Sequence, residues 1–166
     1  MSRLQLYTRV ARLFLGKNTV TAEDIGKSYT LVSNDYRQTF LSAMHQYNDE
    51  MILELAWCLG QSAGHTENLQ VVDLAAGTGY NSIAFRKLFP DTNLTLVDIS
   101  PGMLAEAKKE LRENTSFITD DMLHYLENCT DNSVDVVLCG WAIKYRPPLQ
   151  IIRQCRRVIK PGGWIA

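Results

Sequence analysis

One stretch decides the fold of this chain: Val71-Val72-Asp73-Leu74-Ala75-Ala76-Gly77-Thr78-Gly79-Tyr80. Two β-branched residues lead into an acid, and small residues and a Gly-x-Gly sequence follow. This order predicts a buried strand, a tight turn and the N-terminus of a helix. Glycine tolerates positive φ and lets a ligand approach the backbone closely. Free N–H groups at a helix start favour polar or anionic ligand groups, so this turn is a candidate binding site.

The residues around the glycines limit the kind of ligand. Dinucleotide-binding domains use Gly-x-Gly-x-x-Gly, in which a pyrophosphate lies at the helix N-terminus. Here Ser82 occupies the third glycine position, and a carboxylate at Asp73 would repel phosphates. Both residues favour a ligand that carries a positive group and no phosphate. A strand–turn–helix unit without any ligand stays open as the alternative.

A second acid ends the next predicted strand. Residues 93–99 alternate and then become apolar, as a buried parallel strand does. Asp98 lies about 20 residues beyond the glycine turn, where an acid accepts hydrogen bonds from ribose hydroxyls in nucleotide-binding α/β folds. Ser100-Pro101 then predicts a helix N-cap and a proline at the first helical position. A helix-capping or solvated role is the alternative for Asp98.

Further strands and helices follow in alternation. Residues 116–119 form a short predicted strand that ends in Asp120 and Asp121. Residues 134–138 form an apolar strand after the turn-rich segment 129–133. Residues 151–159 have the pattern of an amphipathic helix, which ends at Lys160-Pro161-Gly162-Gly163. Strands that alternate with helices predict an α/β fold.

These motifs resemble those of the class I S-adenosylmethionine (SAM)-dependent methyltransferases, of the type 11 and type 25 kind. SAM carries an ammonium and a sulfonium and no phosphate, which agrees with Asp73. The matches occur in order over about residues 69–166. They are Asp73-x-x-x-Gly77-x-Gly79, Val97-Asp98-Ile99-Ser100-Pro101-Gly102-Met103-Leu104, the acids that follow the third strand, and Cys155-Arg156-Arg157-Val158-Ile159-Lys160-Pro161-Gly162-Gly163.

The resemblance implies a doubly wound, Rossmann-like and mostly parallel sheet with strand order 3-2-1-4-5. The family sheet has seven strands, and its last two form an antiparallel pair. This sequence stops at Ala166 as the fifth strand begins, so we expect the antiparallel pair to be absent and the fifth strand to have about three residues. An uncovered edge invites association, which predicts either a fragment or a homodimer through the open edge.

The resemblance also implies a role for each site residue. Asp73 and Gly77 would lie toward the methionine end of SAM, Asp98 at the ribose, and Asp120 or Asp121 at the adenine. Asp121 aligns with the family's Gly-Asp-x ending, with Met122 as the backbone donor, but Asp120 replaces the glycine and leaves the choice open. The predicted cofactor-binding set is Asp73, Ala75, Gly77, Gly79, Asp98, Ile99, Met103, Asp120, Asp121, Met122 and Gly140.

The implied reaction is methyl transfer from SAM to a small-molecule acceptor such as a quinone or phenol. The Asn-Pro-Pro-Tyr type of motif found in enzymes that methylate amino groups of nucleic acids is absent after the fourth strand, and the net charge of -1 gives no reason to expect nucleic acid. One alternative is a SAM-binding subunit without turnover. The other is a nicotinamide-dependent oxidoreductase domain, which Asp73, Ser82 and the Lys-Pro-Gly-Gly turn oppose.

No residue is identified as a catalytic base. His124 is predicted to lie on a surface helix. Tyr145 follows the fourth strand, where acceptors approach in the family, between Lys144 and Arg146. These two cations would hold an anionic acceptor or lie in a solvated loop.

The N-terminal part is predicted to form a helical lid segment, residues 1–60, on a core of residues 61–166 within one domain. The first 22 residues carry basic residues and no acid, which fits either an organellar transit peptide or an amphipathic helix with Leu4, Tyr7, Val10 and Phe14 on one face. Residues 17–35 are polar and turn-like. The expected helix 36–60 repeats Phe40, Met44, Tyr47, Met51, Leu55 and Cys58, and Tyr29 or Tyr36 would either reach the cofactor or pack between helices.

The chain has the composition of an ordinary globular protein. Its 166 residues suit one globular domain, and no apolar run is long enough to span a bilayer. None of the four cysteines forms a Cys-x-x-Cys pair, so we expect no zinc site and reduced cysteines in a cytoplasmic protein.

Overall fold

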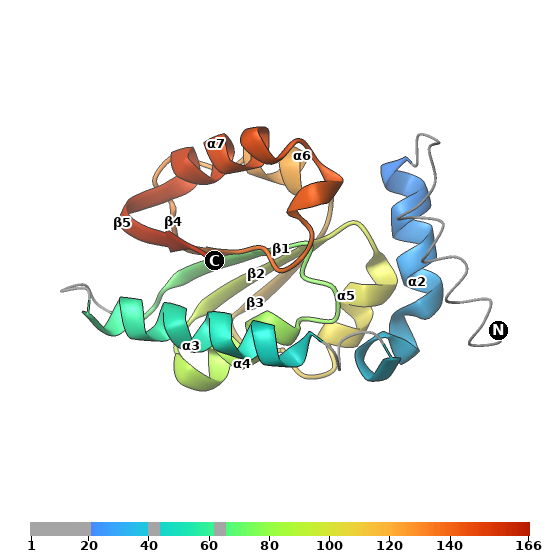
Figure 1. Cartoon of the computed structure of the whole chain (residues 1–166), viewed down its shortest axis with the longest axis horizontal. Coiled ribbons are helices and arrows are strands. Elements are labelled where there is room, and N and C mark those ends of the chain that lie inside the picture. Colours follow the sequence, from blue (N-terminus) through green and yellow to red (C-terminus); the bar gives the residue numbers. More distant parts are fainter. Residues whose placement is uncertain (1–20, 40–43, 62–65) are drawn as a thin grey trace.

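The computed structural model describes residues 21–39, 44–61 and 66–166. The predicted helix with Leu4, Tyr7, Val10 and Phe14 lies outside the described residues. Strands and helices alternate along the chain (Figure 1). The strands are β1 (Gln70–Leu74), β2 (Asn93–Asp98), β3 (Thr115–Thr119), β4 (Val134–Leu138) and β5 (Ile159–Ile165). The helices are α2 (Ala22–Thr39), α3 (His45–Gln61), α4 (Tyr80–Leu88), α5 (Pro101–Ala107), α6 (Met122–Glu127) and α7 (Pro148–Val158), with a short 3-10 helix η1 (Ile143–Tyr145).

The sheet confirms the predicted topology. Its order is β3-β2-β1-β4-β5 and all its pairs are parallel. β1 lies at the centre, where Val72 is opposite Thr95 of β2 and Val137 of β4. The antiparallel pair is absent from the described residues, as expected. The division into a lid and a core at residue 60 stays a prediction.

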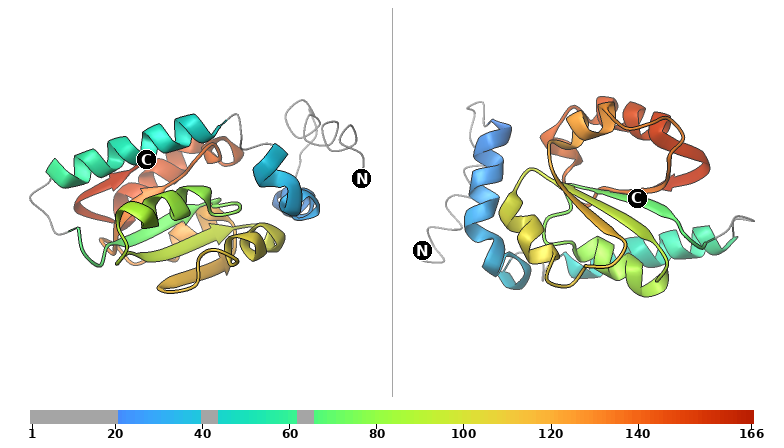
Figure 2. Two further views of the ribbon diagram at one scale, coloured as in Figure 1. Left: turned by 90° about the horizontal axis from the view of Figure 1, so that it is seen from below. Right: turned by 180° about the vertical axis from the view of Figure 1, so that it is seen from behind.

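Helices cover both faces of the sheet, so the fold is doubly wound. In the view from behind in Figure 2, α7 lies on one side of the strands and α3 and α4 lie on the other. The first core cluster joins α3, α4 and α5 to the sheet around Phe85 and Leu96. The second joins α6 and α7 around Leu126 and Ile151. None of the described helices is long and apolar enough to cross a membrane.

The strand, turn and helix expected around the glycines are present. β1 ends at Leu74 and α4 begins at Tyr80. Three residues of the turn have positive φ: Ala75 (52°), Gly77 (57°) and Gly79 (77°). The left-handed region is unfavourable for alanine because Cβ crowds the following carbonyl. The turn therefore stores strain at Ala75.

Replacing Ala75 with glycine is expected to stabilise the protein. Glycine adopts positive φ without strain, so the free energy of unfolding should rise by about 1 kcal/mol. Urea unfolding of Ala75→Gly measures the change. Ala84→Gly, within α4, is the matched control, because glycine in a helix interior is expected to lower stability by about 1 kcal/mol. Equal losses in both variants would contradict the assignment of strain to Ala75.

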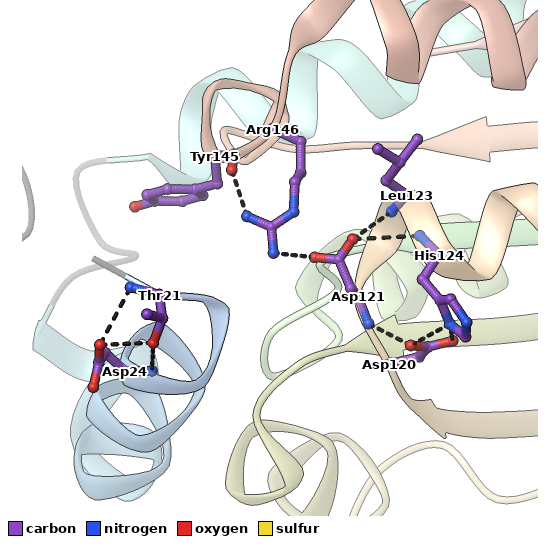
Figure 3. Close-up of polar contacts among 8 residues, drawn as sticks. All are labelled: Thr21, Asp24, Asp120, Asp121, Leu123, His124, Tyr145 and Arg146. Carbon is purple, nitrogen blue, oxygen red and sulfur yellow. Dashed lines mark hydrogen bonds and ion pairs between the residues drawn. The ribbon is translucent and has the colours of Figure 1, made fainter. Parts of the chain in front are cut away.

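Residues 17–35 were expected to be turn-like, and this expectation is wrong from Ala22 onward. α2 runs from Ala22 to Thr39. It begins with a reciprocal cap, in which the Asp24 N–H donates to Thr21 Oγ1 and the Thr21 N–H donates to Asp24 Oδ2, both at 3.2 Å (Figure 3). This pair satisfies two N–H groups that a helix start leaves without partners.

α2 packs very closely against α5 and the loop before it, which are its neighbours in Figure 1. A Cβ on Gly26 would lie 2.8 Å from the Ile99 carbonyl oxygen. A Cβ on Gly102 would lie 3.0 Å from Thr30 Cα. The Thr30 and Ser100 hydroxyls are 2.8 Å apart. Close contacts at the two glycines and the contact between the two hydroxyls thus hold α2 beside the end of β2.

The expected helix 36–60 is wrong in its first part, because α3 begins at His45 and Tyr36 belongs to α2. Phe40 lies outside the described residues. The predicted apolar stripe is displaced as well, since Tyr47 is 61% exposed. Among the residues of the predicted stripe that the structure describes, only Leu55 is buried. The buried residues of α3 are Asn48, Ile52, Leu55 and Leu59.

β5 is longer than expected. It spans Ile159–Ile165, so it includes the Lys160-Pro161-Gly162-Gly163 turn that was expected to precede it. Its register with β4 shifts there, from Val134 opposite Ile159 to Val136 opposite Trp164. The turn is a bulge within the strand, which accommodates proline and glycine in the sheet. β5 pairs with β4, and no other described strand covers its outer edge.

Candidate functional site

A pocket opens at the carboxyl ends of β1, β2, β3 and β4, with α2 and the start of α3 as its outer wall. The loops that follow the four strands each contribute a part of its lining. Ligands of open α/β sheets bind at this edge. Asp73 and Gly79 do not line the pocket. The predicted residues that line it are Ala75, Gly77, Asp98, Ile99, Met103, Asp120, Asp121, Met122 and Gly140.

Asp98 lies in the pocket wall and is held by two backbone groups. Gly77 N–H donates to Asp98 Oδ2 at 2.7 Å, and Ser100 N–H donates to Asp98 Oδ1 at 2.8 Å. Only 8% of the residue is exposed, and burial raises the pKa of its carboxyl to about 6. The N-cap of α5 is Ser100, whose hydroxyl accepts from Met103 N–H at 3.2 Å. Asp98 is thus neither solvated nor the cap of α5, and it joins the glycine turn to the end of β2.

Asp73 lies behind the pocket wall. It is 1% exposed, and Ser82 Oγ donates to Asp73 Oδ2 at 2.7 Å. Burial raises the pKa of the Asp73 carboxyl to about 7. The serine at the third glycine position therefore has a structural role, because it fastens the first turn of α4 to the end of β1. Gly79 lies in the core, where a Cβ would be 3.0 Å from Ala107 Cβ.

Asp73 makes the stability of the protein depend on pH. The pKa of its carboxyl is raised from 3.8 to about 7 in the folded state, so the folded state favours the neutral acid. The stabilising contribution is complete below the unfolded pKa and is lost as pH rises through about 7. Urea unfolding between about pH 4 and about pH 8 should show wild type losing stability relative to Asp73→Asn. A difference that does not change with pH would contradict this prediction.

The two acids after β3 line the pocket but have different partners (Figure 3). Asp121 caps α6, with Oδ1 accepting from Leu123 N–H at 3.0 Å, and it forms an ion pair with Arg146. Asp120 Oδ2 pairs with His124 Nδ1 at 2.8 Å. Asp120 raises the pKa of the exposed His124 imidazole, which lies on surface helix α6 as predicted. The choice between the two acids for adenine stays a prediction.

Two buried asparagines of the pocket were missed by the sequence reasoning. Asn48 comes from α3 and Asn81 from the first turn of α4. Asn48 Oδ1 accepts from Trp141 Nε1 at 2.8 Å. Asn81 Oδ1 has no hydrogen-bond partner among the described residues, and a Cβ on Gly140 would lie 2.5 Å from Asn81 Nδ2. In the sequence, each of these amides shares a helix face with apolar residues. An amide that is buried on such a face needs a hydrogen-bond partner, and this could have marked both residues.

Helix α2 and the loop after β4 meet across the pocket. The hydroxyls of Tyr29 on α2 and Tyr145 on η1 are 3.0 Å apart, and Tyr36 meets Tyr29 edge-on at 5.6 Å between ring centroids. Burial raises the pKa of both Tyr29 and Tyr36, the latter to about 12, so both hydroxyls stay protonated near neutral pH. Lys144 and Arg146 also line the pocket. Within the described ranges, no cluster of His, Cys, Asp or Glu suits a metal ion.

Comparison with known proteins gives a family and relatives. The methyltransferase domain family matches residues 71–163. A malonyl-[acyl-carrier protein] O-methyltransferase of Dechloromonas aromatica is 26% identical over 132 residues, which make up 78% of this chain and 48% of that protein. A demethylmenaquinone methyltransferase of Chlamydia trachomatis is 32% identical over 115 residues, 67% of this chain and 48% of that protein. The chain therefore spans about half the length of these relatives.

Solved structures share the fold. A Haloferax volcanii protein in complex with the Trm112 methyltransferase activator is 25% identical, with a TM-score of 0.63 over 82% of this chain and 57% of that chain. A SAM-dependent methyltransferase of Thiobacillus denitrificans, in complex with S-adenosyl-L-homocysteine (SAH), is 22% identical, with a TM-score of 0.54 over 70% of this chain and 46% of that chain. The family match covers more than half of the chain, and together with the parallel sheet of order 3-2-1-4-5 it shows that this chain belongs to the class I SAM-dependent methyltransferases.

Proposed function

We propose that this chain binds SAM in the pocket at the carboxyl ends of its strands and transfers a methyl group to a small-molecule acceptor. One observation carries the proposal: a single pocket joins Asp120 and Asp121, Asp98, Gly77 and Gly140. Asp98 ends β2, and the other residues follow β3, β1 and β4; the sheet order of these strands is β3, β2, β1 and β4. The same order suits adenine, ribose and methionine along one extended ligand.

The donors and acceptors of the pocket fit SAM. The Asp98 carboxylate offers two oxygens to vicinal ribose hydroxyls. Asn81 Oδ1 is a buried acceptor that lacks a hydrogen-bond partner among the described residues, and the amide nitrogen of the same side chain lies beside Gly140. A buried acceptor without a donor is unfavourable, and the ammonium of the methionine end would satisfy it. This fit favours a cationic amino-acid end over a pyrophosphate at the glycine turn.

When bound, SAM supplies a methyl group on a positively charged sulfur, which is already an activated leaving group. The residues of the chain then mainly hold cofactor and acceptor in line, and such positioning contributes much of the acceleration in bimolecular transfers. A base is needed only for acceptors that must lose a proton. Tyr29 and Tyr36 do not suit that role, because burial raises the pKa of each.

A small-molecule acceptor is supported by the relatives, whose names refer to a quinone and to a malonyl group on a carrier protein. A homodimer through the outer edge of β5, a cytoplasmic location and the absence of nucleic-acid binding stay predictions.

Isothermal titration with SAH, SAM and NAD⁺ tests the proposal. We expect SAH and SAM to bind and NAD⁺ not to bind, and binding of NAD⁺ alone would overturn the cofactor. A methyl-transfer assay with labelled SAM on a panel of quinols, phenols and carboxylic acids then tests turnover. SAM binding without transfer to any compound of the panel would favour a SAM-binding subunit without turnover.

A further inference from the structure

Trp141, at the mouth of the pocket, has an unusual backbone conformation. It follows Gly140 at the end of β4 with a φ of 65°. A bulky residue in the left-handed region is a conformational outlier, and such outliers gather at ligand-binding positions. The surrounding structure holds the residue in this conformation, because its indole N–H donates to Asn48 Oδ1, a side chain that is itself 3% exposed.

The indole is fixed in orientation but is not covered. Tyr47 meets it edge-on, with 6.0 Å between ring centroids and an interplanar angle of 72°. Trp141 is 49% exposed although it lines the pocket. Its N–H is already bonded to Asn48, so the surface that remains available is the apolar ring. A fixed, accessible aromatic ring suits a flat ring stacked on it.

The charges near Trp141 restrict the acceptor further. Lys144 lines the same pocket three residues beyond Trp141, and Arg146, five residues beyond it, is ion-paired with Asp121. An indole face also attracts cations, but Lys144 and the positive sulfur of the SAM proposed to lie beside the acceptor oppose a cationic ligand. A neutral or anionic ring therefore fits best.

We propose that Trp141, held by Asn48, is the platform on which the methyl acceptor docks, and that the acceptor is a planar aromatic compound that is neutral or anionic. This inference rests on the proposed function, because the pocket must hold SAM beside the acceptor. It goes further in naming the residue that selects the acceptor and the chemical class selected.

The experiment is isothermal titration of the chain with three probes, both with saturating SAH and without it. The probes are 2-naphthoate, its saturated analogue decahydro-2-naphthoate, and the cation N-methylquinolinium. We expect the aromatic anion to bind about tenfold more tightly than either of the others. Trp141→Ala should lose this tenfold advantage, and Trp141→Phe, which keeps a ring, should retain most of it.

Trp57→Ala is the matched control, because Trp57 is an exposed tryptophan of α3 that does not line the pocket. It should bind all probes like wild type. If Trp141→Ala unfolds, Trp141→Leu replaces it as a larger side chain without an aromatic ring. Equal binding of the aromatic anion by wild type and the ring-less variant, or no preference of wild type for it, would overturn the platform. Failure of SAH to bind, with the aromatic preference intact, would instead overturn the proposed cofactor and leave the platform supported.

Discussion

Replacing Asp98 with alanine is expected to weaken SAH binding by about 1.5–3 kcal/mol, roughly 10–150-fold. The carboxylate is fixed by the N–H groups of Gly77 and Ser100, and it lines the pocket where the ribose is proposed to lie. The variant removes the acceptor of two ribose hydroxyls and also releases the glycine turn. Isothermal titration of SAH into wild type and variant measures the loss.

Controls separate lost contacts from lost structure. Asp98→Asn keeps one acceptor oxygen and should bind between wild type and Asp98→Ala. Asp91→Ala removes an exposed carboxylate just before β2 and should leave SAH binding unchanged. Asp98 accepts from two backbone N–H groups, so urea unfolding of each variant establishes that it is folded before the titration. A folded Asp98→Ala protein with unchanged affinity for SAH would remove Asp98 from the site.

The core of the fold was predictable because buried parallel strands are apolar and end at recognisable turns. The strands β1 (Gln70–Leu74) and β4 (Val134–Leu138) are of this kind, and each is followed by a loop that reaches the pocket. The carboxyl ends of parallel strands meet at one edge, so acids far apart in sequence come together there. This geometry explains why most of the predicted cofactor residues line one pocket.

α2 has an apolar contact with α5, in which Val32 is buried against Met103 with Tyr29 packed beside them, but polar and turn-forming residues between its apolar positions hid the helical pattern. It packs through Gly26 and Thr30 onto the Ile99 carbonyl and the Ser100 hydroxyl, and glycine lowers helix propensity. Its start was nevertheless visible in the sequence, since Thr21 and Asp24 have the spacing of a capping box.

The position of Asp73 in the sequence does not determine the direction in which its side chain points. An acid at the end of a buried strand can point into the pocket or toward the following helix, and a partner decides between them. Ser82 is that partner here, although in the sequence it counted only as a missing glycine. Asn81 was missed for a similar reason, because the exposed or buried state of an amide depends on tertiary packing.

Gly79→Ala is expected to lower the free energy of unfolding by about 2–4 kcal/mol, whereas Gly77→Ala should lower it by about 1–2 kcal/mol. Both glycines have positive φ, so both variants strain the backbone. At Gly79 the new Cβ would also lie 3.0 Å from Ala107 Cβ and 3.2 Å from Leu96 Cδ2, which overpacks the core between α4, α5 and β2. At Gly77 no atom lies within 4 Å of the new Cβ.

For SAH affinity we expect the opposite order, with Gly77→Ala more affected than Gly79→Ala. Gly77 lines the pocket and Gly79 does not, so the methyl group of Gly77→Ala occupies space where the cofactor is proposed to approach the backbone. Urea unfolding without ligand, followed by titration of SAH into the folded fraction, measures both effects on the same proteins. We expect Gly77→Ala to lose more affinity and Gly79→Ala to lose more stability. If both variants lost stability and affinity to the same extent, the division of roles would be wrong. Gly79 would then not serve packing while Gly77 serves access for the ligand, and the turn would act as one unit.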